Sequence, residues 1–280
     1  MSRWILGGLR TGIKTTRFPG HELRGEEGAG STVQLHWQGL TPAGALKVAA
    51  ICPTSAIEAT GDEAAGELKF DAGACIMCGR CVRSLPAAFT ANSDPRVAVR
   101  ERQQLQTTVR WGGGQGPAPT QLQAAATAVQ SRAVRLFRHS LHIRHVDAGS
   151  CNGCESELQM LGTPYLDLHR LGFFFTPTPR HADALLVTGV VTRNMEEPLL
   201  ATYAAMPAPK LVIAAGACAL SGGSFADGLM TNGPVDRLLP VDVYVPGCPP
   251  TPQALLHGLL VAVDRAERRY RAGVESHDGA

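Results

Sequence analysis

Apolar and polar positions alternate in blocks along the second half of the chain. Four apolar runs have the length of buried strands, at residues 141–146, 184–188, 210–215 and 241–245. Three segments compatible with helices are interleaved with them, at residues 155–161, at 195–205, and from Pro249-Pro250 to about residue 270. Strands that alternate with helices predict an α/β fold, here a flavodoxin-like doubly wound parallel sheet.

The first half of the chain has shorter apolar segments and more turn residues. Apolar segments lie at 45–51 and 67–70, and residues 20–31 are rich in Gly and Glu, which is typical of a loop. Residues 112–119 are dominated by Gly and Pro and predict a linker, and 120–139 predicts a helix. We therefore expect three parts: a small α+β domain at 1–105, a linker and helix at 106–138, and the α/β domain at 139–280.

Composition and charge exclude one broad class of function. The chain has 280 residues, of which 44% are hydrophobic, and its net charge is +2 with 5% aromatic residues. Nucleic-acid-binding proteins usually carry a concentrated basic face or stacking aromatic side chains. We expect no nucleic-acid partner.

The apolar stretches are too short to cross a membrane. The longest, at 184–191 and 254–263, fall well below the roughly 20 residues of a spanning helix. The N-terminus lacks the apolar region and cleavage site of a secretory signal. We therefore expect a cytoplasmic protein, in which thiols stay reduced.

Eight cysteines form two groups of four, about 70 residues apart. Four disulfides would suit a small secreted domain, whereas two sets of four thiols suit two metal centres. The first group is Cys52, Cys75, Cys78 and Cys81, and the second is Cys151, Cys154, Cys218 and Cys248.

The second group follows the ends of three predicted strands. The carboxyl ends of parallel strands share one edge of a sheet, where ligands bind. A glycine lies near every cysteine, and two predicted helices begin there, whose N-termini favour a negatively charged cluster. This pattern favours a [4Fe–4S] cluster, with a four-cysteine zinc site or buried free thiols as the alternatives.

The first group has the spacing of one half of a two-cluster bacterial ferredoxin. Cys75-x-x-Cys78-x-x-Cys81 would supply three ligands, and the distant Cys52-Pro53 would supply the fourth. The cysteines of the second cluster are all replaced, in register, by Pro42, Ala45, Val48 and Leu85. We expect one [4Fe–4S] cluster in a degenerate two-cluster module, with a zinc ribbon as the alternative.

The motifs of residues 139–280 resemble the small, proximal-cluster subunit of group 4 membrane-bound [NiFe] hydrogenases and formate hydrogenlyase. That family is related to the subunit of respiratory complex I that holds the last cluster before quinone. The C-x-x-C spacing favours the hydrogenase branch, because complex I subunits carry adjacent cysteines. A weaker likeness of Leu9-Arg10-Thr11-Gly12, with Thr15, Thr16 and Pro19, to the ferredoxin-like subunit implies a fusion with an extended N-terminal segment. The matching motifs are Cys151-Asn152-Gly153-Cys154-Glu155, Pro179-Arg180-His181-Ala182-Asp183, Val187-Thr188-Gly189 and Val245-Pro246-Gly247-Cys248-Pro249-Pro250.

The resemblance implies an electron-transfer subunit of an oxidoreductase complex, with no catalytic residue of its own. Two [4Fe–4S] clusters held by the eight cysteines would connect a ferredoxin-like donor with a large [NiFe] subunit. Membrane-arm subunits would hold the complex on the inner face of the cell membrane. The alternatives are a complex-I-like quinone-reducing subunit, a related complex without nickel, and a zinc-stabilised interaction module.

Three further sets of polar residues allow both a functional and a structural interpretation. Arg180 and His181 could donate to the proximal cluster or pair with Asp183. Glu155 and Glu157 could move protons, contact the large subunit, or be solvated or capping. The basic residues could form a solvated helix face or a docking site; they are Arg132, Arg135, Arg138 and Arg144.

Overall fold

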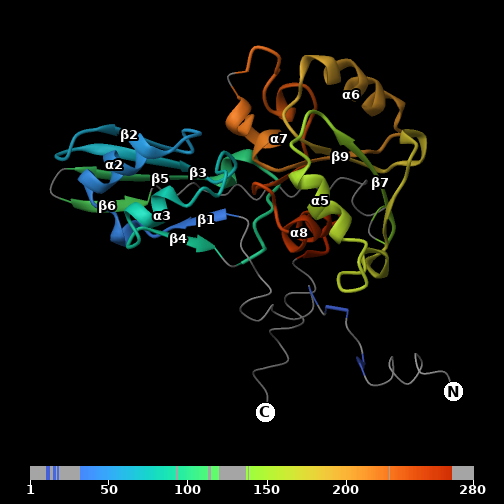
Figure 1. Cartoon of the computed structure of the whole chain (residues 1–280), viewed down its shortest axis with the longest axis horizontal. Coiled ribbons are helices and arrows are strands. Elements are labelled where there is room, and N and C mark those ends of the chain that lie inside the picture. The colour runs from blue at the N-terminus through green and yellow to red at the C-terminus, as the bar shows by residue number, and fades with distance from the viewer. Residues whose placement is uncertain are drawn as a thin grey trace.

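The computed structural model describes residues 11, 12, 15, 16, 18, 32–92, 94–112, 115–119, 137, 139–226 and 228–266 (Figure 1). The loop expected at 20–31 and almost all of the helix expected at 120–139 lie outside these residues. So do Leu9, Arg10 and Pro19 of the N-terminal motif. Its described part docks on the α/β domain: Thr16 N donates to Tyr165 O at 2.6 Å, and the Phe18 side chain is buried.

The N-terminal domain is built from two strand–helix–strand units. The first strand of one unit pairs antiparallel with the last strand of the other, in β1–β4 and in β2–β3. The units are β1 (Thr32–Leu35), α2 (Pro42–Ile51) and β2 (Ile57–Gly61), then β3 (Gly66–Asp71), α3 (Arg80–Ser84) and β4 (Phe89–Asn92), with a 3₁₀ turn at Trp37–Gly39. A core of its own supports this domain.

The expected linker is instead a β-hairpin of this domain. β5 (Gln106–Gly112) pairs with β3, and β6 (Gln115–Pro119) forms the edge of a sheet with the order β2-β3-β5-β6. Val109 and Trp111, two residues apart, both point to the buried face of β5 and pack in the core of this domain. The prolines are tolerated because β6 is an edge strand. The boundary expected at 105 is therefore wrong, since the domain extends to residue 119.

The second domain confirms the predicted α/β fold, with a five-stranded parallel sheet. The strand order β11-β10-β9-β7-β8 is the doubly wound order of flavodoxin-like folds. The strands are β7 (Leu141–Asp147), β8 (Phe173–Phe175), β9 (Ala184–Thr188), β10 (Leu211–Ala215) and β11 (Val243–Val245). The helices are α5 (Gly153–Met160), α6 (Arg193–Ala205), α7 (Ala217–Ser221) and α8 (Pro252–Ala262), with 3₁₀ turns at Leu168–Leu171, Pro179–His181, Gly223–Phe225 and Val235–Arg237.

Both faces of the sheet are covered, so its central strands are apolar throughout. Along β9, Ala184 and Leu186 face the core shared with α5 and α8, whereas Leu185 and Val187 face the core shared with α6 and α7. Figure 1 shows these helix pairs on opposite sides of the sheet. A strand buried on both faces lacks polar alternation.

The last helix begins later and ends earlier than expected. Thr251 Oγ1 accepts from Ala254 N at 3.4 Å and Pro252 occupies the first turn, so the helix starts after Pro249-Pro250. Asp264, with a φ of 55°, ends it near residue 262. None of the helices in the described part of the chain has the length and apolar character needed to span a bilayer.

Residues 94–105, here called the seam segment, fasten the two domains together. Val99 and Tyr244 exchange backbone hydrogen bonds of 3.0 and 2.8 Å, which places Val99 beside the edge of β11. Ala98 N donates to His257 Nδ1 at 3.3 Å, and the Arg100 guanidinium donates to Val261 O. Hydrogen bonds of the seam segment therefore hold the two domains against each other before the chain enters β5.

Acidification should weaken the contact between the seam segment and α8, because His257 becomes protonated at low pH. Burial lowers the pKa of His257 to about 4, with Arg96 acting in the same direction and Asp94 opposing it. The unfolded chain, with a histidine pKa near 6.5, takes up this proton first. The free energy of unfolding should therefore fall between about pH 6.5 and 4, by about 3 kcal/mol.

Amide hydrogen exchange at Ala98, with urea unfolding, measures this loss at each pH. His257→Gln keeps an acceptor that does not titrate, so this variant should show a flatter pH profile. An identical acid dependence in wild type and variant would contradict the assignment to His257.

Two candidate metal centres

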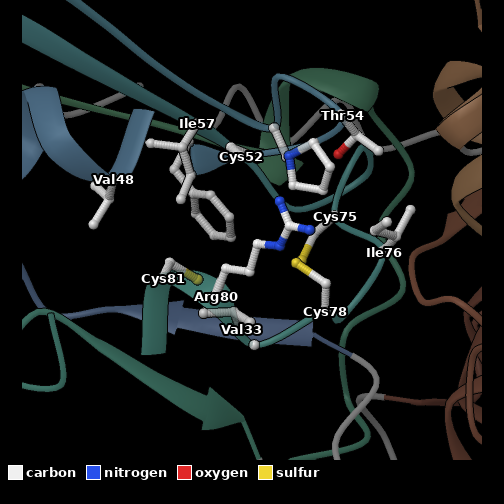
Figure 2. Close-up of a pocket in the computed structure, with 14 residues that line it drawn as sticks. Val33, Val48, Cys52, Thr54, Ile57, Cys75, Ile76, Cys78, Arg80 and Cys81 are labelled. Carbon is white, nitrogen blue, oxygen red and sulfur yellow. The ribbon is translucent and has the colours of Figure 1, made fainter. Parts of the chain in front are cut away.

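The first four cysteines line one small, mostly apolar cavity. Cys52 caps the C-terminus of α2, Cys81 lies in α3, and Cys75 and Cys78 lie in the loop between β3 and α3. Figure 2 shows the cavity between apolar side chains that include Val33, Val48 and Ile57. The fourth ligand predicted from sequence, Cys52, is thus brought to the C-x-x-C-x-x-C run.

Two of these thiols, those of Cys75 and Cys81, are buried among neighbouring cysteines. Burial raises the pKa of Cys75 to about 11 and also raises the pKa of Cys81, and the neighbouring cysteines add to both shifts. A backbone hydrogen bond from Met77 to Cys75 opposes the shift. Burial thus favours the neutral form of these two thiols, and a cationic iron–sulfur core would favour their ionised form.

The place of the missing second cluster is filled by side chains. Ala45 and Val48 on α2 are completely buried. A Cβ built at Gly44 would lie 2.9 Å from Leu85 Cδ2, so Leu85 packs tightly on α2. Apolar packing replaces ligands at these positions, which fits a domain with one remaining site.

The second four cysteines gather at the carboxyl edge of the parallel sheet. Cys151 and Cys154 follow β7, Cys218 lies in α7 after β10, and Cys248 follows β11. Burial and the charges of neighbouring groups raise the pKa values of Cys154, Cys218 and Cys248; that of Cys218 reaches about 11. The four cysteines of this group thus come from three separate segments that follow three strands of the sheet.

Glycines leave room around these sulfurs. A Cβ built at Gly216 would lie 2.7 Å from Cys154 Sγ, and one built at Gly223 would lie 3.0 Å from Cys218 Sγ. Gly216 has a φ of 94° and a ψ of 151°, a conformation that only glycine adopts readily. Four thiols in a glycine-lined cradle fit a bulky [4Fe–4S] group. Within the described residues, no three or more His, Cys, Asp or Glu side chains form a group suited to a single metal ion.

Glu155 anchors the start of α5 through a buried polar network that the sequence did not predict. Its Oε2 accepts from Ser150 Oγ at 2.6 Å, and its Oε1 accepts from Thr188 Oγ1. His145 Nε2 lies 2.8 Å from Thr188 Oγ1 and 3.7 Å from Glu155 Oε1. Glu155 is therefore neither solvated nor free. The sequence feature that could have predicted this network is a pair of polar residues near the carboxyl ends of β7 and β9, namely His145 and Thr188.

Arg180 and His181 do not lie near the sheet-edge cysteines. Both are exposed, in a 3₁₀ turn before β9, and therefore at the amino edge of the sheet. Asp183 Oδ2 instead accepts from His142 N at 2.8 Å. The suggested role of Arg180 and His181 at the cluster is thus wrong.

Of the four basic residues singled out in the sequence, the structure describes only Arg144. Arg144 lies in β7, so it shares no helix with the others; Arg132, Arg135 and Arg138 lie outside the described residues. Burial raises the pKa of Glu157, which is partly exposed on α5. None of the four arginines is thus placed on a described docking face.

Comparisons with known proteins match the part of the chain that carries the second cysteine group. Residues 151–262 match the family described as NADH ubiquinone oxidoreductase, 20 Kd subunit. Formate hydrogenlyase subunit 7 of Escherichia coli is 41% identical over 156 residues, which cover 56% of this chain and 61% of that protein. An NADH-quinone oxidoreductase subunit of Rubrobacter xylanophilus is 46% identical over 123 residues, 44% of this chain and 49% of that protein.

A third relative is matched over most of its length. The probable membrane-bound hydrogenase subunit mbhJ of Pyrococcus furiosus is 46% identical over 135 residues, which cover 48% of this chain and 81% of that protein. The resemblance inferred from the motifs is thereby confirmed. The chain belongs to the family of the 20 kDa subunit of NADH ubiquinone oxidoreductase, together with subunits of membrane-bound hydrogenases.

Proposed function

We propose that this chain is the electron-transfer subunit of a membrane-attached, hydrogenase-type oxidoreductase complex. It carries two [4Fe–4S] clusters, one in the cavity of the N-terminal domain and one at the sheet edge, between a ferredoxin-like donor and a large [NiFe] subunit. Each cluster accepts and releases one electron at a time. The observation that carries the proposal is the gathering of all eight cysteines into these two sites.

The chain's own residues position the two sites and tune them. Apolar walls at the cavity and the glycine cradle at the sheet edge limit solvent, which influences the reduction potential. Backbone amides near the sulfurs, such as that of Met77, supply hydrogen bonds that also tune the potential. No side chain of the chain is required to make or break a bond of a substrate.

The hydrogenase branch is supported by the spacing of Cys151 and Cys154, which are separated by two residues. Relatives named for hydrogenase and for quinone reductase both match this chain, so a complex-I-like function is the second candidate. Nickel and hydrogen turnover in the purified complex support the first candidate, and nickel-free quinone reduction supports the second. Association with the inner face of the membrane, through partner subunits, is part of both.

Metal content tests the clusters directly. The chain purified without oxygen should contain about eight iron and about eight acid-labile sulfide, the content of two [4Fe–4S] units. Metal analysis and the EPR spectrum of the reduced chain measure this. Stoichiometric zinc with negligible iron would instead establish the zinc-stabilised module, and about four iron would leave only one cluster.

A further inference from the structure

Arg102 lies in the seam segment, between the two cysteine sites. It begins the 3₁₀ turn Arg102–Leu105, just before β5. Its side chain is 16% exposed, and the sequence motifs assign it no role. Figure 1 shows this part of the chain between the sheet of the N-terminal domain and α7.

The guanidinium group of Arg102 contacts both domains. Nη1 and Nη2 donate to the two carboxylate oxygens of Asp71 at 2.8 and 2.6 Å, a bidentate pair. Nε donates to Leu220 O at 3.4 Å. One planar group thus bridges the end of β3 and helix α7.

Each of these partners is close in sequence to a predicted ligand. Asp71 precedes the loop that carries Cys75, and its Oδ1 also accepts from Gly73 N at 2.8 Å. Leu220 belongs to α7, the helix that carries Cys218. Ala72 N donates to Leu105 O at 2.9 Å, which holds the same loop on the seam segment.

The cysteine-bearing loop leaves space for this guanidinium. A Cβ built at Gly73 would lie 2.7 to 2.9 Å from Arg102 Nη1, Cζ and Nη2. Gly73 does not have a positive φ, so the close approach of Arg102, and not backbone strain, is what a larger residue there would disturb. An alanine there must push the guanidinium away from Asp71 or from Leu220.

We infer that Arg102 is a positioning residue that sets the separation between the two cluster sites. This inference rests on the proposed function. The fixed planar fork of arginine holds two oxygens of Asp71 in one geometry, which lysine cannot reproduce. Electron transfer between two centres slows steeply with distance, so a residue that ties the Cys75 loop to the Cys218 helix controls the rate between them.

Three substitutions test the inference in the full chain purified without oxygen. Arg102→Gln removes the fork, Arg102→Lys keeps the charge without the fork, and Gly73→Ala displaces the guanidinium while keeping it. Arg110→Gln is the matched control, because Arg110 pairs with Glu67 at 2.6 Å within the same sheet and is 66% exposed. For each variant we would measure the iron content and the two reduction potentials. EPR would give the magnetic coupling of the doubly reduced clusters, and a kinetic experiment would give the rate of electron transfer between them.

The three test variants should keep their iron and both potentials. Their magnetic coupling should weaken, and the electron-transfer rate between the clusters should fall by about tenfold. Arg110→Gln should match the wild type. Wild-type coupling in Arg102→Lys or in Gly73→Ala would overturn the inference, as would loss of iron in all three, which would make Arg102 an assembly residue.

A metal-independent readout separates this inference from the proposed function. Hydrogen exchange at the Ala72 amide should accelerate in the three variants even when no iron is bound, because the loop then leaves the seam segment. A wild-type chain without two clusters would contradict the proposed function. Unchanged hydrogen exchange at the Ala72 amide would contradict the positioning role of Arg102.

Discussion

Replacing Cys248 by alanine is expected to reduce turnover of the whole complex to background. Cys248 is one of four thiols delivered by three separate loops at the carboxyl edge of the sheet, and no fifth cysteine lies in this domain to replace it. An incomplete ligand set leaves a labile cluster. In the proposed complex, association with the large subunit should weaken as well, because the sheet-edge cluster would deliver electrons to that subunit. Hydrogen turnover and co-purification measure the two effects.

Cys52→Ala is the matched variant at the other site. Its cavity lies in the N-terminal domain, which has its own core, so assembly should be preserved while transfer from the external donor stops. A small viologen that reaches the sheet-edge cluster should restore turnover in Cys52→Ala and not in Cys248→Ala. If both variants respond alike, the two clusters do not act in series.

Gly216→Ala is expected to remove the sheet-edge cluster without removing any cysteine. The added Cβ would lie 2.7 Å from Cys154 Sγ, and the backbone conformation itself costs alanine about 1–3 kcal/mol. Gly216 N donates to Val245 O at 2.9 Å, which holds the backbone against adjustment. Bound iron should fall from about eight to about four per chain.

Gly162→Ala is the control for this substitution. A Cβ at Gly162 would lie 3.6 Å from Gln159 O, an ordinary contact, and Gly162 lacks a positive φ. This variant should keep its full iron content and both EPR signals. Full iron content in Gly216→Ala would mean that the sheet edge does not hold a cluster in the way proposed here.

The sequence predicted the α/β domain well because burial on both faces leaves uninterrupted apolar runs. All five residues of β9 are buried, and its predicted bounds are confirmed. The delivery of Cys151, Cys154, Cys218 and Cys248 to one edge then follows from the parallel topology alone. β8 was not predicted, because a three-residue edge strand carries too few positions to show a pattern.

The junction between the domains could not be predicted from local patterns. The Gly/Pro content of 112–119 resembles a linker, but Val109 and Trp111 bury the preceding strand and make the segment an edge hairpin. The seam segment is polar, and its hydrogen bonds reach the backbone of residues more than 100 positions away. Such long-range contacts to carbonyl groups leave no periodic signal in the chain.

The pairing of Val99 with Tyr244 has a consequence for solubility. β11 is a terminal strand of the sheet, and an uncovered terminal strand offers unpaired backbone groups to a second molecule. Val99 forms hydrogen bonds with the backbone N–H and C=O of Tyr244. The seam segment thus prevents a strand of a second molecule from pairing with β11 at this position. An isolated α/β domain would expose the edge of β11 together with the surface of α8 that the seam segment contacts. It should therefore self-associate at concentrations at which the intact chain stays dispersed.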